Sequence, residues 1–573
     1  MTSPKKLLRS ARWFSDTGVR GFAHRQRLQQ VGYRREEFMD KPVVAIINTW
    51  SDISPCHQHL RDRAEAVKRG VWAAGGFPLE LPALSLGEVM VKPTTMMYRN
   101  LLAMEAEELL RSHPVDGAVL LGGCDKTGPG LVMGALSMNL PAIFCPAGFM
   151  ASGQHKGQRV GAGTHTRTFW DDYRAKKITE SEMVHLETVM TRSIGTCNTV
   201  GTATTMTSII DAMGLSLPGA SSIPAVDGGH PRMASECGSR IVQMIREDRT
   251  PRSFLTPGSI QNAAVAYLAL GGSTNAAVHL VAMARRAGFS FGLDDLEKLA
   301  RKIPVLANVF PAGRYLMDDF FFAGGLHALL SEVKEHLDLS ATSCTGQTMG
   351  DLCKDAKAVD TDVIRAQNNP ISKIPGLAVL RGNLAPDGCV IKPSAASAEL
   401  MKHTGPALVF DSMAELMAKI DAPELDVTAN TVLVLRSAGP QGAPGMPEWG
   451  ALPIPKKLLE AGIRDMVRIS DARMSGTHGG TCVLHVAPES HVGGPLALVR
   501  TGDTVSLDVA ARSLTLHVSD EELVERKKAW TPPPPAYERG YGSMFLQHIQ
   551  QANDGCDFDF LAKHAANPEP PIF

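Results

Sequence analysis

The chain has 573 residues and a mass of 61.4 kDa, which exceeds the usual size of one hydrophobic core, so two domains are expected. Its residues are 44% apolar and 20% charged, a balance that excludes intrinsic disorder, collagen-like structure and a coiled-coil rod. The 58 basic and 59 acidic residues leave a formal net charge of −1, so the overall electrostatic potential would not attract nucleic acid or an anionic membrane.

The N-terminal segment 1–16 carries basic residues but lacks the apolar stretch that a secretory signal needs. No apolar run along the chain approaches the roughly 20 residues of a membrane span. We therefore expect a cytoplasmic protein with no membrane partner and no nucleic-acid partner. The ten cysteines are dispersed, so a disulfide framework is not expected, and most of them should be small buried hydrophobes.

Short apolar runs alternate with amphipathic stretches in the first 150 residues. Strands are predicted at Val43–Ile47, Phe77–Leu81, Gly117–Leu121 and Ala142–Cys145, and helices at His59–Ala74, Arg99–His113 and Gly130–Asn139. This alternation is typical of an α/β domain with a parallel sheet and helices on both faces. Further helices are predicted at Ala203–Met213 and Ala276–Ala287. The second follows a glycine turn in LGGSTNAAVHL, which is either an anion-binding helix start or only a cap.

After Asn368-Asn369-Pro370 the hydrophobicity pattern of the sequence changes to short apolar runs with turns between them. Strands are predicted at Val390–Lys392, Leu408–Phe410, Val432–Leu435, Val483–Val486, Thr504–Val509 and Leu514–Val518. The last two alternate apolar and polar residues like a hairpin, which favours a β-rich, barrel-like second domain. A stiff linker is predicted at Pro532–Pro535 and a last packing helix at Tyr541–Ala552. We therefore divide the chain into domains 1–370 and 371–573.

Polar and thiol side chains follow the ends of three predicted strands. Cys56 comes after the first strand, Glu88 after the second, and Cys124, Asp125 and Lys126 after the third. Ligands of open parallel sheets bind beyond the carboxyl ends of the strands, so these side chains are expected to converge at one edge. Soft thiols beside hard carboxylates are what a site with two kinds of metal needs. Each of these residues also has an ordinary interpretation as a solvated loop side chain.

A third thiol, Cys197, lies in IGTCNTVGTA just before a predicted helix, where a helix N-terminus would stabilise its thiolate. The three cysteines are too far apart in sequence for a zinc-finger template, so their spacing alone specifies no metal. Two glycine-rich loops lie in the second domain, RSAGPQGAPGMPEW with Glu448 and DARMSGTHGG with Ser475 and Thr477. Glycine lets backbone amides approach a ligand closely, although such loops are also ordinary turns.

Eight motifs follow one another along almost the whole chain: PCHQHL, LGE, GGCDKTGPG, GTCNTVGTATTM, LGGSTNAAVHL, GPQGAPGMPEW, DARMSGTHGG and GCDFDFL. With them the sequence resembles the iron–sulfur dihydroxy-acid dehydratases, a family that includes phosphogluconate dehydratase and the sugar-acid (aldonate) dehydratases. The run from GGCDKT through GTCNTVGTATTM to LPGASSIPAVD is most similar to the sugar-acid branch, such as arabinonate or xylonate dehydratases. The third cysteine motif differs from the one usual in the branched-chain enzymes.

The resemblance implies three thiolate ligands for an Fe–S cluster: Cys56, Cys124 and Cys197. It implies a [2Fe–2S] cluster, with [4Fe–4S] as the alternative. It also implies four ligands for Mg²⁺: Glu88, Asp125, a carbamylated Lys126 and Glu448. Ser475 would be the catalytic base and would contact the substrate together with Thr477. Because Ser475 and the thiols belong to different domains, the active site is expected between the domains.

The implied activity is that of a hydro-lyase. Water would leave a 2,3-dihydroxy acid, a small sugar acid, to give a 2-keto-3-deoxy acid, with the cluster as Lewis acid and a serine alkoxide as base. A homodimer or a dimer of dimers is expected. The chain departs from the family at His57, where Asn is frequent, and at Ser-Gly-Thr, where the branched-chain enzymes usually read Ser-Gly-Gly; both departures bear on substrate preference.

Three alternatives stay open at this point. The substrate could be a branched-chain or short dihydroxy acid such as glycerate. The chain could instead be a zinc hydrolase built on Cys56, His57, His59 and Cys124. It could also be a non-catalytic metal-binding protein on the same fold. The sequence does not identify the acid.

Overall fold

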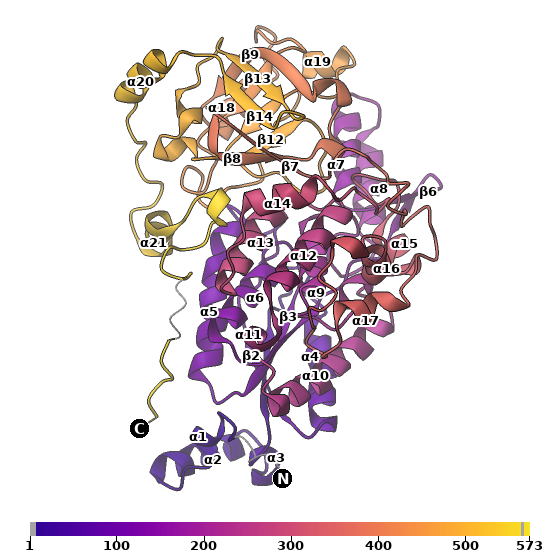
Figure 1. Cartoon of the computed structure of the whole chain (residues 1–573), viewed down its shortest axis with the longest axis vertical. Coiled ribbons are helices and arrows are strands. Elements are labelled where there is room, and N and C mark those ends of the chain that lie inside the picture. Colours follow the sequence, from indigo (N-terminus) through magenta and orange to yellow (C-terminus); the bar gives the residue numbers. More distant parts are fainter. Residues whose placement is uncertain (1–6, 563–566, 573) are drawn as a thin grey trace.

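The computed structural model describes residues 7–562 and 567–572 and confirms an α/β first half followed by a β-barrel (Figure 1). The first half is built on a parallel sheet of order β2-β1-β3-β4: β1 (Val43–Asn48), β2 (Phe77–Pro82), β3 (Gly117–Gly122) and β4 (Ala142–Pro146). All residues of β1, β3 and β4 are buried. Their continuous apolar runs are therefore explained by helices that cover both faces.

Four helices cover this sheet: α4 (Leu60–Ala73), α5 (Arg99–Ser112), α6 (Thr127–Met138) and α10 (Gly229–Glu247). α4 packs against α10 on one face, and α5 packs against α6 on the other (Figure 1). Two glycines permit these close contacts. A Cβ at Gly70 would lie 1.8 Å from a backbone oxygen of α10, and one at Gly134 would lie 2.5 Å from a backbone oxygen of α5.

The strand order reverses between β1 and β3. The chain leaves β1 through α4 toward β2 on one side, and leaves β3 through α6 toward β4 on the other. Such a reversal leaves a crevice beyond the carboxyl ends of the two strands, which is where ligands of open α/β sheets bind. The segments that follow these ends, 49–59 and 123–126, carry Cys56 and the Cys124-Asp125-Lys126 triplet.

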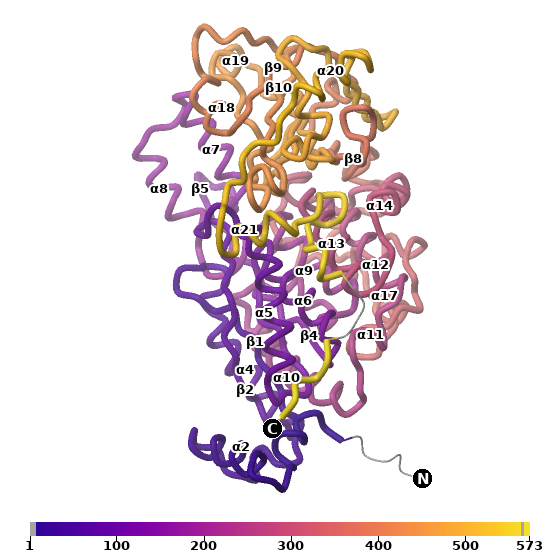
Figure 2. Tube along the Cα trace, turned by 90° about the vertical axis from the view of Figure 1, so that its left-hand side faces the viewer, coloured from indigo at the N-terminus to yellow at the C-terminus, as the bar shows by residue number. Residues whose placement is uncertain are grey.

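Buried helices fill the space between the sheet and the second half. They include α9 (Thr202–Ala212), whose residues are all buried, α12 (Pro257–Ala269) and α13 (Asn275–Arg286). The two helices predicted in this region are thereby confirmed. An unpredicted insertion consists of β5 (Gly153–His155), β6 (Gln158–Val160), α7 (Thr164–Arg174) and α8 (Glu180–Met190). Figure 2 shows α7 beside the elements of the barrel half.

The second half closes into a barrel of order β10-β11-β12-β8-β7-β14-β13-β9. Its strands are β7 (Ala378–Gly382), β8 (Ala385–Ile391), β9 (Lys402–Phe410), β10 (Val432–Leu435), β11 (Arg468–Ser470), β12 (Cys482–Ala487), β13 (Thr504–Asp508) and β14 (Ser513–Leu516). The predicted hairpin is confirmed, since β13 and β14 pair antiparallel. Sequence analysis missed β7 and β11, which are short and offer little periodicity.

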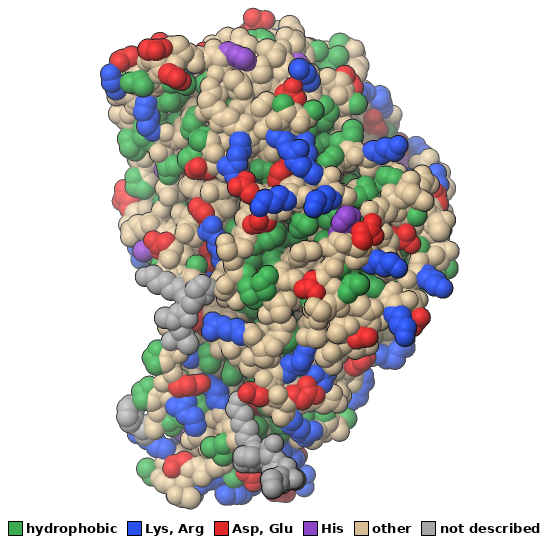
Figure 3. Space-filling view, viewed as in Figure 1, with side chains coloured by type: hydrophobic (Ala, Val, Ile, Leu, Met, Phe, Trp, Pro, Cys, Tyr) green, Lys and Arg blue, Asp and Glu red, His purple; other side chains and the backbone are tan. Residues whose placement is uncertain are grey.

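Side chains of both charge signs are interspersed over the face in Figure 3, in keeping with the net charge of −1. In the part of the chain that the structure describes, no helix is long and apolar enough to cross a membrane. The C-terminal segment runs from the barrel back along the first half (Figure 2). Its helix α21 (Gly540–His548) ends earlier than predicted and is followed by the 3-10 turn η8 (Ala552–Asp554).

A buried ion pair fixes this returning segment. Arg286 Nε lies 2.6 Å from Asp557 Oδ2, and both side chains are 1% exposed. Removing one partner of such a pair leaves an uncompensated buried charge, which costs about 3–5 kcal/mol. We expect Asp557→Asn to lower the Tm clearly in a thermal melt, while Asp559→Asn, at an exposed position on the same segment, should leave it within a degree or so of the parent. Equal melting of the two variants would contradict this role.

Candidate active site

Three cysteine thiols lie together beyond the carboxyl ends of β1 and β3. The Cys124 thiol lies close enough to Cys56 to raise the pKa of that thiol, and the backbone N–H of Glu88 donates to Cys124 Sγ at 3.4 Å. Cys197 lies close enough to Asp125 and Cys124 for their charges, added to burial, to raise the pKa of its thiol. The interaction with Cys124, burial and the neighbouring thiols raise the pKa of Cys56 well above its ordinary value. The structure thus brings together all three predicted thiols, which come from widely separated segments.

The expectation of a helix-stabilised thiolate at Cys197 is wrong. α9 begins only at Thr202, with Gly201 as its N-cap, so Cys197 is not in the first turn. Burial, followed by the charge of Asp125, raises the pKa of Cys197 to about 12. A thiolate here needs a positive charge other than the helix dipole, such as a metal cation.

Cys124 lies at a strained point of the chain between β3 and α6. Its φ of +64° is in the left-handed region, which is uncommon for a residue other than glycine. Residues held in this region cluster at functional sites, where the surrounding structure supports the strain. The preceding Gly123 is packed tightly, since a Cβ there would lie 2.5 Å from the Ala147 side chain.

Both ring nitrogens of His57 make hydrogen bonds, so neither is free to bind a metal ion. Its Nδ1 lies 2.8 Å from Ser85 Oγ and its Nε2 lies 2.8 Å from the carbonyl oxygen of Gly123. Burial lowers the pKa of this fully enclosed imidazole to about 4. Because both ring nitrogens are engaged, the zinc alternative loses one of its four proposed ligands. The Nε2 of His59 is likewise within 2.7 Å of the Ala147 carbonyl oxygen.

The ammonium group of Lys126 lies among three carboxylates. Its Nζ is 3.1 Å from Glu88 Oε2, 3.2 Å from Asp125 Oδ2 and 3.1 Å from Glu448 Oε1. Burial and the charge of Arg473 act to lower the pKa of Lys126, but the carboxylates raise it above its ordinary value. Burial raises the pKa of Asp125 to about 6. The three predicted carboxylate ligands of magnesium therefore meet around the fourth predicted ligand, Lys126, which is an ammonium group here.

Glu448 joins the two halves of the chain at this point. Its Oε1 accepts hydrogen bonds from Lys126 Nζ at 3.1 Å, from Asn275 Nδ2 at 2.6 Å and from Arg473 Nη1 at 3.0 Å. Burial alone would raise the pKa of Glu448, but the charges of Lys126 and Arg473 lower it to about 2. Glu448 is therefore an ionised, largely enclosed carboxylate, whose charge is stabilised by cationic and amide neighbours.

Arg473 is fully buried and connects two of the carboxylates. Its Nε donates to the Met446 carbonyl oxygen at 2.8 Å, and its Nη2 donates to Thr94 Oγ1 at 3.1 Å. Thr94 Oγ1 in turn donates to Glu88 Oε1 at 2.8 Å. Through these contacts and its bond to Glu448, the guanidinium group holds the barrel loop against the loop that carries Glu88.

Sequence analysis missed Arg473, Asn275 and Thr94 as site residues. Arg473 and Asn275 lie within two motifs that it singled out, DARMSGTHGG and LGGSTNAAVHL. A charged or amide side chain inside an otherwise apolar and glycine-rich motif was the available signal. Asn275 is the first residue of α13, so the glycine turn before it serves to place an amide on Glu448.

The chemical types of the donor atoms, thiols and carboxylates, suit the two metal groups that the resemblance implies. Within residues 7–562 and 567–572, no group of three or more His, Cys, Asp or Glu side chains has the geometry to hold a metal ion. The Lys126 ammonium nevertheless stands in for a cation among the three carboxylates, and hard oxygen ligands are those that Mg²⁺ prefers. The three adjacent thiols are the ligand type of an Fe–S cluster.

The loop that carries Ser475 extends from the barrel, between β11 and β12, onto the helices of the first half. Ser475 Oγ lies 2.9 Å from Thr477 Oγ1. A Cβ at Gly476 would lie 2.5 Å from the side chain of Ser273, just before α13, so only glycine permits this approach. The Ser475 loop therefore meets the first half next to the residue pair Asn275 and Glu448.

Comparison with known protein families matches both halves of the chain. Residues 41–352 match the N-terminal model of the dihydroxy-acid/6-phosphogluconate dehydratases, and residues 362–556 match the C-terminal model. A 6-deoxy-6-sulfo-D-gluconate dehydratase of Pseudomonas putida is 63% identical over 568 residues, which cover 99% of this chain and 98% of that protein. These matches confirm the resemblance drawn from the motifs.

Two further relatives are similar along nearly their whole length. An L-arabinonate dehydratase of Rhizobium leguminosarum bv. trifolii is 47% identical over 560 residues, which cover 97% of this chain and 96% of that protein. A dihydroxy-acid dehydratase of Caldicellulosiruptor saccharolyticus is 36% identical over 555 residues, which cover 94% of this chain and 99% of that protein. Of these three relatives, the two named for sugar acids are more similar to this chain than the third.

Proposed function

The chain belongs to the dihydroxy-acid/6-phosphogluconate dehydratase family and is a dehydratase, and on that premise we propose that it removes water from a sugar acid to give a 2-keto-3-deoxy acid. One observation carries the proposal: three thiols and a cation-binding set of three carboxylates lie together where the Ser475 loop meets the first half. The names of two relatives, 6-deoxy-6-sulfo-D-gluconate and L-arabinonate dehydratase, support a sugar acid over a branched-chain acid.

We propose that two groups absent from the protein chain complete the site. A [2Fe–2S] cluster on Cys56, Cys124 and Cys197 would supply, when bound, a Lewis acid for the departing C3 hydroxide without any redox change. A Mg²⁺ ion on Glu88, Asp125, Glu448 and a carbamylated Lys126 would supply, when bound, positive charge beside the substrate carboxylate and 2-hydroxyl. Carbamylation turns the lysine from a cation into an anionic oxygen ligand.

Ser475 is the group that takes the C2 proton in this proposal. The C2–H bond breaks toward Ser475 Oγ, the C3–O bond breaks as hydroxide leaves, and the enol tautomerises to the 2-keto acid. A serine is a weak base in water, so its alkoxide must be stabilised by neighbouring donors and cations. The hydroxyl of Thr477, 2.9 Å from Ser475 Oγ, is placed to donate to that alkoxide.

The test is a panel of aldonic acids scored for 2-keto acid formation. Gluconate, galactonate, xylonate, arabinonate and glycerate differ in chain length and stereochemistry, so the panel also separates sugar acids from short dihydroxy acids. Turnover of a sugar acid supports the proposal, and turnover confined to glycerate or to a branched-chain dihydroxy acid would overturn it.

We also propose the domain boundary, location and assembly that the sequence analysis expected. The boundary after residue 370 is supported by the first barrel strand, which begins at Ala378, and it lies close to the gap between the two family matches, which end at 352 and begin at 362. The protein would be a cytoplasmic homodimer or dimer of dimers. Light scattering of the purified protein distinguishes these assemblies from a monomer.

Activity is expected to need Mg²⁺ or Mn²⁺, because hard carboxylates and soft thiolates select different metals. Chelation should abolish turnover while leaving visible absorption largely intact. Glu448→Gln should behave like the chelated enzyme, since it removes the charge on which Lys126, Asn275 and Arg473 converge. Glu105→Gln is the matched control, because this half-buried carboxylate accepts, within the part of the chain that the structure describes, only from the Leu84 backbone N–H. Full activity of Glu448→Gln would refute the magnesium site.

A further inference from the structure

A small pocket of about 120 Å³ lies beside the Ser475 loop and is rich in arginine. One wall is a face of α7, where Arg167, Asp171 and Arg174 recur at helical spacing. The other walls come from residues 451–459, which follow Glu448, and from residues 464–479. Its charged and titratable lining residues are Arg167, Asp171, Arg174, Arg464, Arg468 and His478. We name it the arginine pocket.

Positive charge in the arginine pocket is only partly compensated. Arg174 pairs with Asp421 at 2.9 Å and Arg468 pairs with Asp465 at 2.7 Å. Among the described residues, the side chains of Arg167 and Arg464 have neither a hydrogen bond nor an ion pair. Four arginines thus face a single lining carboxylate, and two of them are free to bind an anion.

Two buried nitrogens of the lining residues also lack partners. The Nε of Arg468, whose side chain is 7% exposed, has no hydrogen-bond partner within residues 7–562 and 567–572, and neither does the Nδ1 of His478. Buried polar atoms are normally hydrogen-bonded, so such unpaired atoms indicate a missing ligand or water. The arginine pocket is therefore incomplete as a purely structural feature.

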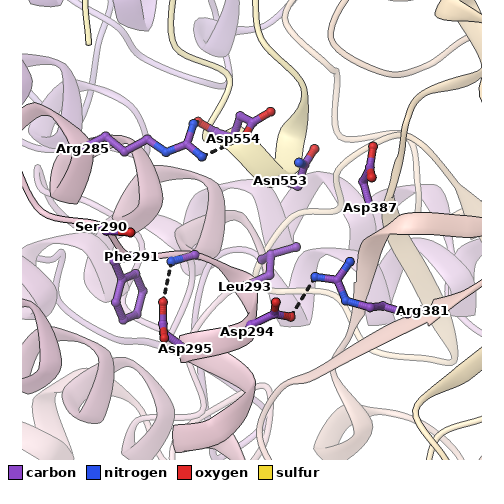
Figure 4. Close-up of a pocket in the computed structure, with 11 residues that line it drawn as sticks. Arg285, Ser290, Phe291, Leu293, Asp294, Asp295, Arg381, Asp387, Asn553 and Asp554 are labelled. Atoms are coloured by element: carbon purple, nitrogen blue, oxygen red, sulfur yellow. Dashed lines mark hydrogen bonds and ion pairs between the residues drawn. The ribbon is translucent and has the colours of Figure 1, made fainter. Parts of the chain in front are cut away.

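A second cavity shows what a compensated site looks like. It has about 370 Å³ and lies near α14 (Leu293–Ala300), η8 and the start of the barrel (Figure 4). There Arg285 pairs with Asp554 at 2.7 Å and Arg381 pairs with Asp294 at 2.7 Å. Both of its arginines are satisfied by the protein, so that cavity gives no sign of an anionic ligand.

The arginine pocket adjoins the proposed reaction centre. His478 lines it, and the backbone N–H of His478 donates to the Ser475 carbonyl oxygen at 3.1 Å. At the start of α7, Thr164 Oγ1 donates to the Thr477 carbonyl oxygen at 2.9 Å, which anchors the arginine-bearing helix on the same loop. The arginine pocket and the Ser475 loop are thus in direct contact through His478 and the start of α7.

We propose that the arginine pocket binds a second anionic group, a sulfonate or a phosphate, at the end of the sugar acid remote from its carboxylate. This inference rests on the proposed function and specifies its substrate class. Arginine suits the task because its planar guanidinium offers several donors to a tetrahedral oxyanion and stays charged at all relevant pH values. An uncharged terminal hydroxymethyl group would leave Arg167 and Arg464 unpaired.

The test compares three acids of equal carbon number: D-gluconate, 6-deoxy-6-sulfo-D-gluconate and 6-phospho-D-gluconate. Losing a charge-assisted hydrogen bond typically lowers affinity by roughly 10- to 100-fold, so kcat/KM for at least one terminally charged acid should exceed that for D-gluconate by this factor or more. The two charged acids distinguish a sulfonate from a phosphate ligand. Calorimetric titration of the holoenzyme with each acid measures binding independently of turnover.

Arg464→Gln and Arg167→Gln provide the structural test. Each should reduce the preference for the terminally charged acid over D-gluconate by roughly 10-fold or more, chiefly through KM, because the pocket contacts the remote end and not the reacting carbons. Arg301→Gln is the matched control, since Arg301 lies at the end of α14 and pairs with Glu297. It should keep the parent preference.

The outcomes separate this inference from the proposed function. Turnover of D-gluconate as efficient as that of both charged acids would overturn the arginine pocket and leave the dehydratase proposal standing. An unchanged preference in both Arg464→Gln and Arg167→Gln would do the same. If neither these three acids nor any other sugar acid of the panel is dehydrated, the proposed function fails, and the titrations still decide whether the arginine pocket prefers a terminal anion.

Discussion

Ser475→Ala is expected to fold, to retain iron and magnesium, and to lose nearly all turnover. Removing one small, partly exposed hydroxyl costs little stability. It removes the group proposed to take the C2 proton, and proton transfer by a positioned side chain contributes on the order of 10²–10⁴-fold by itself. The loss should appear in kcat, because the substrate carboxylate and its remote end are bound by other residues.

Exchange of the substrate C2 proton with deuterated solvent is the decisive measurement. Ser475→Ala should exchange it far more slowly than the parent enzyme. Ser506→Ala makes the same change on barrel strand β13, where the hydroxyl contacts Thr404 and His517, and should leave exchange intact. Wild-type exchange in Ser475→Ala would assign the base to another residue. His478 is then the first to test, because its imidazole lies three residues away in the same loop and is neutral near pH 7, since burial lowers its pKa to about 4.

The α/β half could be predicted closely because local patterns and tertiary environment agree there. Val43–Asn48 and Gly117–Gly122 are continuous apolar runs, and they are the central strands that helices cover on both sides. The insertion around α7 was not predicted: none of the residues of α7 is buried, and its few apolar side chains are aromatic residues among polar and charged ones. That insertion carries Arg167, so the arginine pocket was also invisible in the sequence.

The candidate site, too, could be predicted from the sequence only in part. Cys56 and Cys124 could be placed together from strand order alone, since their loops follow neighbouring parallel strands. The contact of Glu448 with Asn275 and Arg473 could not, because it depends on how the barrel docks on α13. Side-chain pairing between distant segments leaves no local periodicity, so only the motifs that contain these residues pointed to them.

Backbone geometry at two positions, Gly476 and Cys124, helps to form the candidate site. Gly476 allows the serine loop to approach Ser273, and the conformation of Cys124 lets its thiol reach both Cys56 and the Glu88 backbone N–H. In both cases the chain adopts a geometry that costs conformational freedom or strain. The fold thus brings the proposed metal ligands together from separate segments, and we expect the loss of a single ligand to be severe.

Cys124→Ser is accordingly expected to bleach the protein and abolish activity, and Cys56→Ser and Cys197→Ser should do the same. Anaerobically purified parent protein should absorb broadly in the visible and contain about two irons per chain, as a [2Fe–2S] cluster requires. A serine hydroxyl is a harder and far less acidic ligand than a thiol, so it holds iron poorly. Iron content and the visible spectrum measure the loss directly, without reference to turnover.

Cys353→Ser is the matched control for these variants. Cys353 is also buried, on α17 (Met349–Lys354), but among the described residues its thiol hydrogen-bonds only to the sulfur of Met349, at 3.8 Å. This substitution should therefore keep both colour and iron, even if it lowers stability somewhat. Equal bleaching by Cys353→Ser would show that the loss of colour reports unfolding and not ligation. Zinc in place of iron in the parent protein would refute the cluster itself. A colourless zinc protein is also the result that the hydrolase alternative requires. Against that alternative, both ring nitrogens of His57 are already engaged.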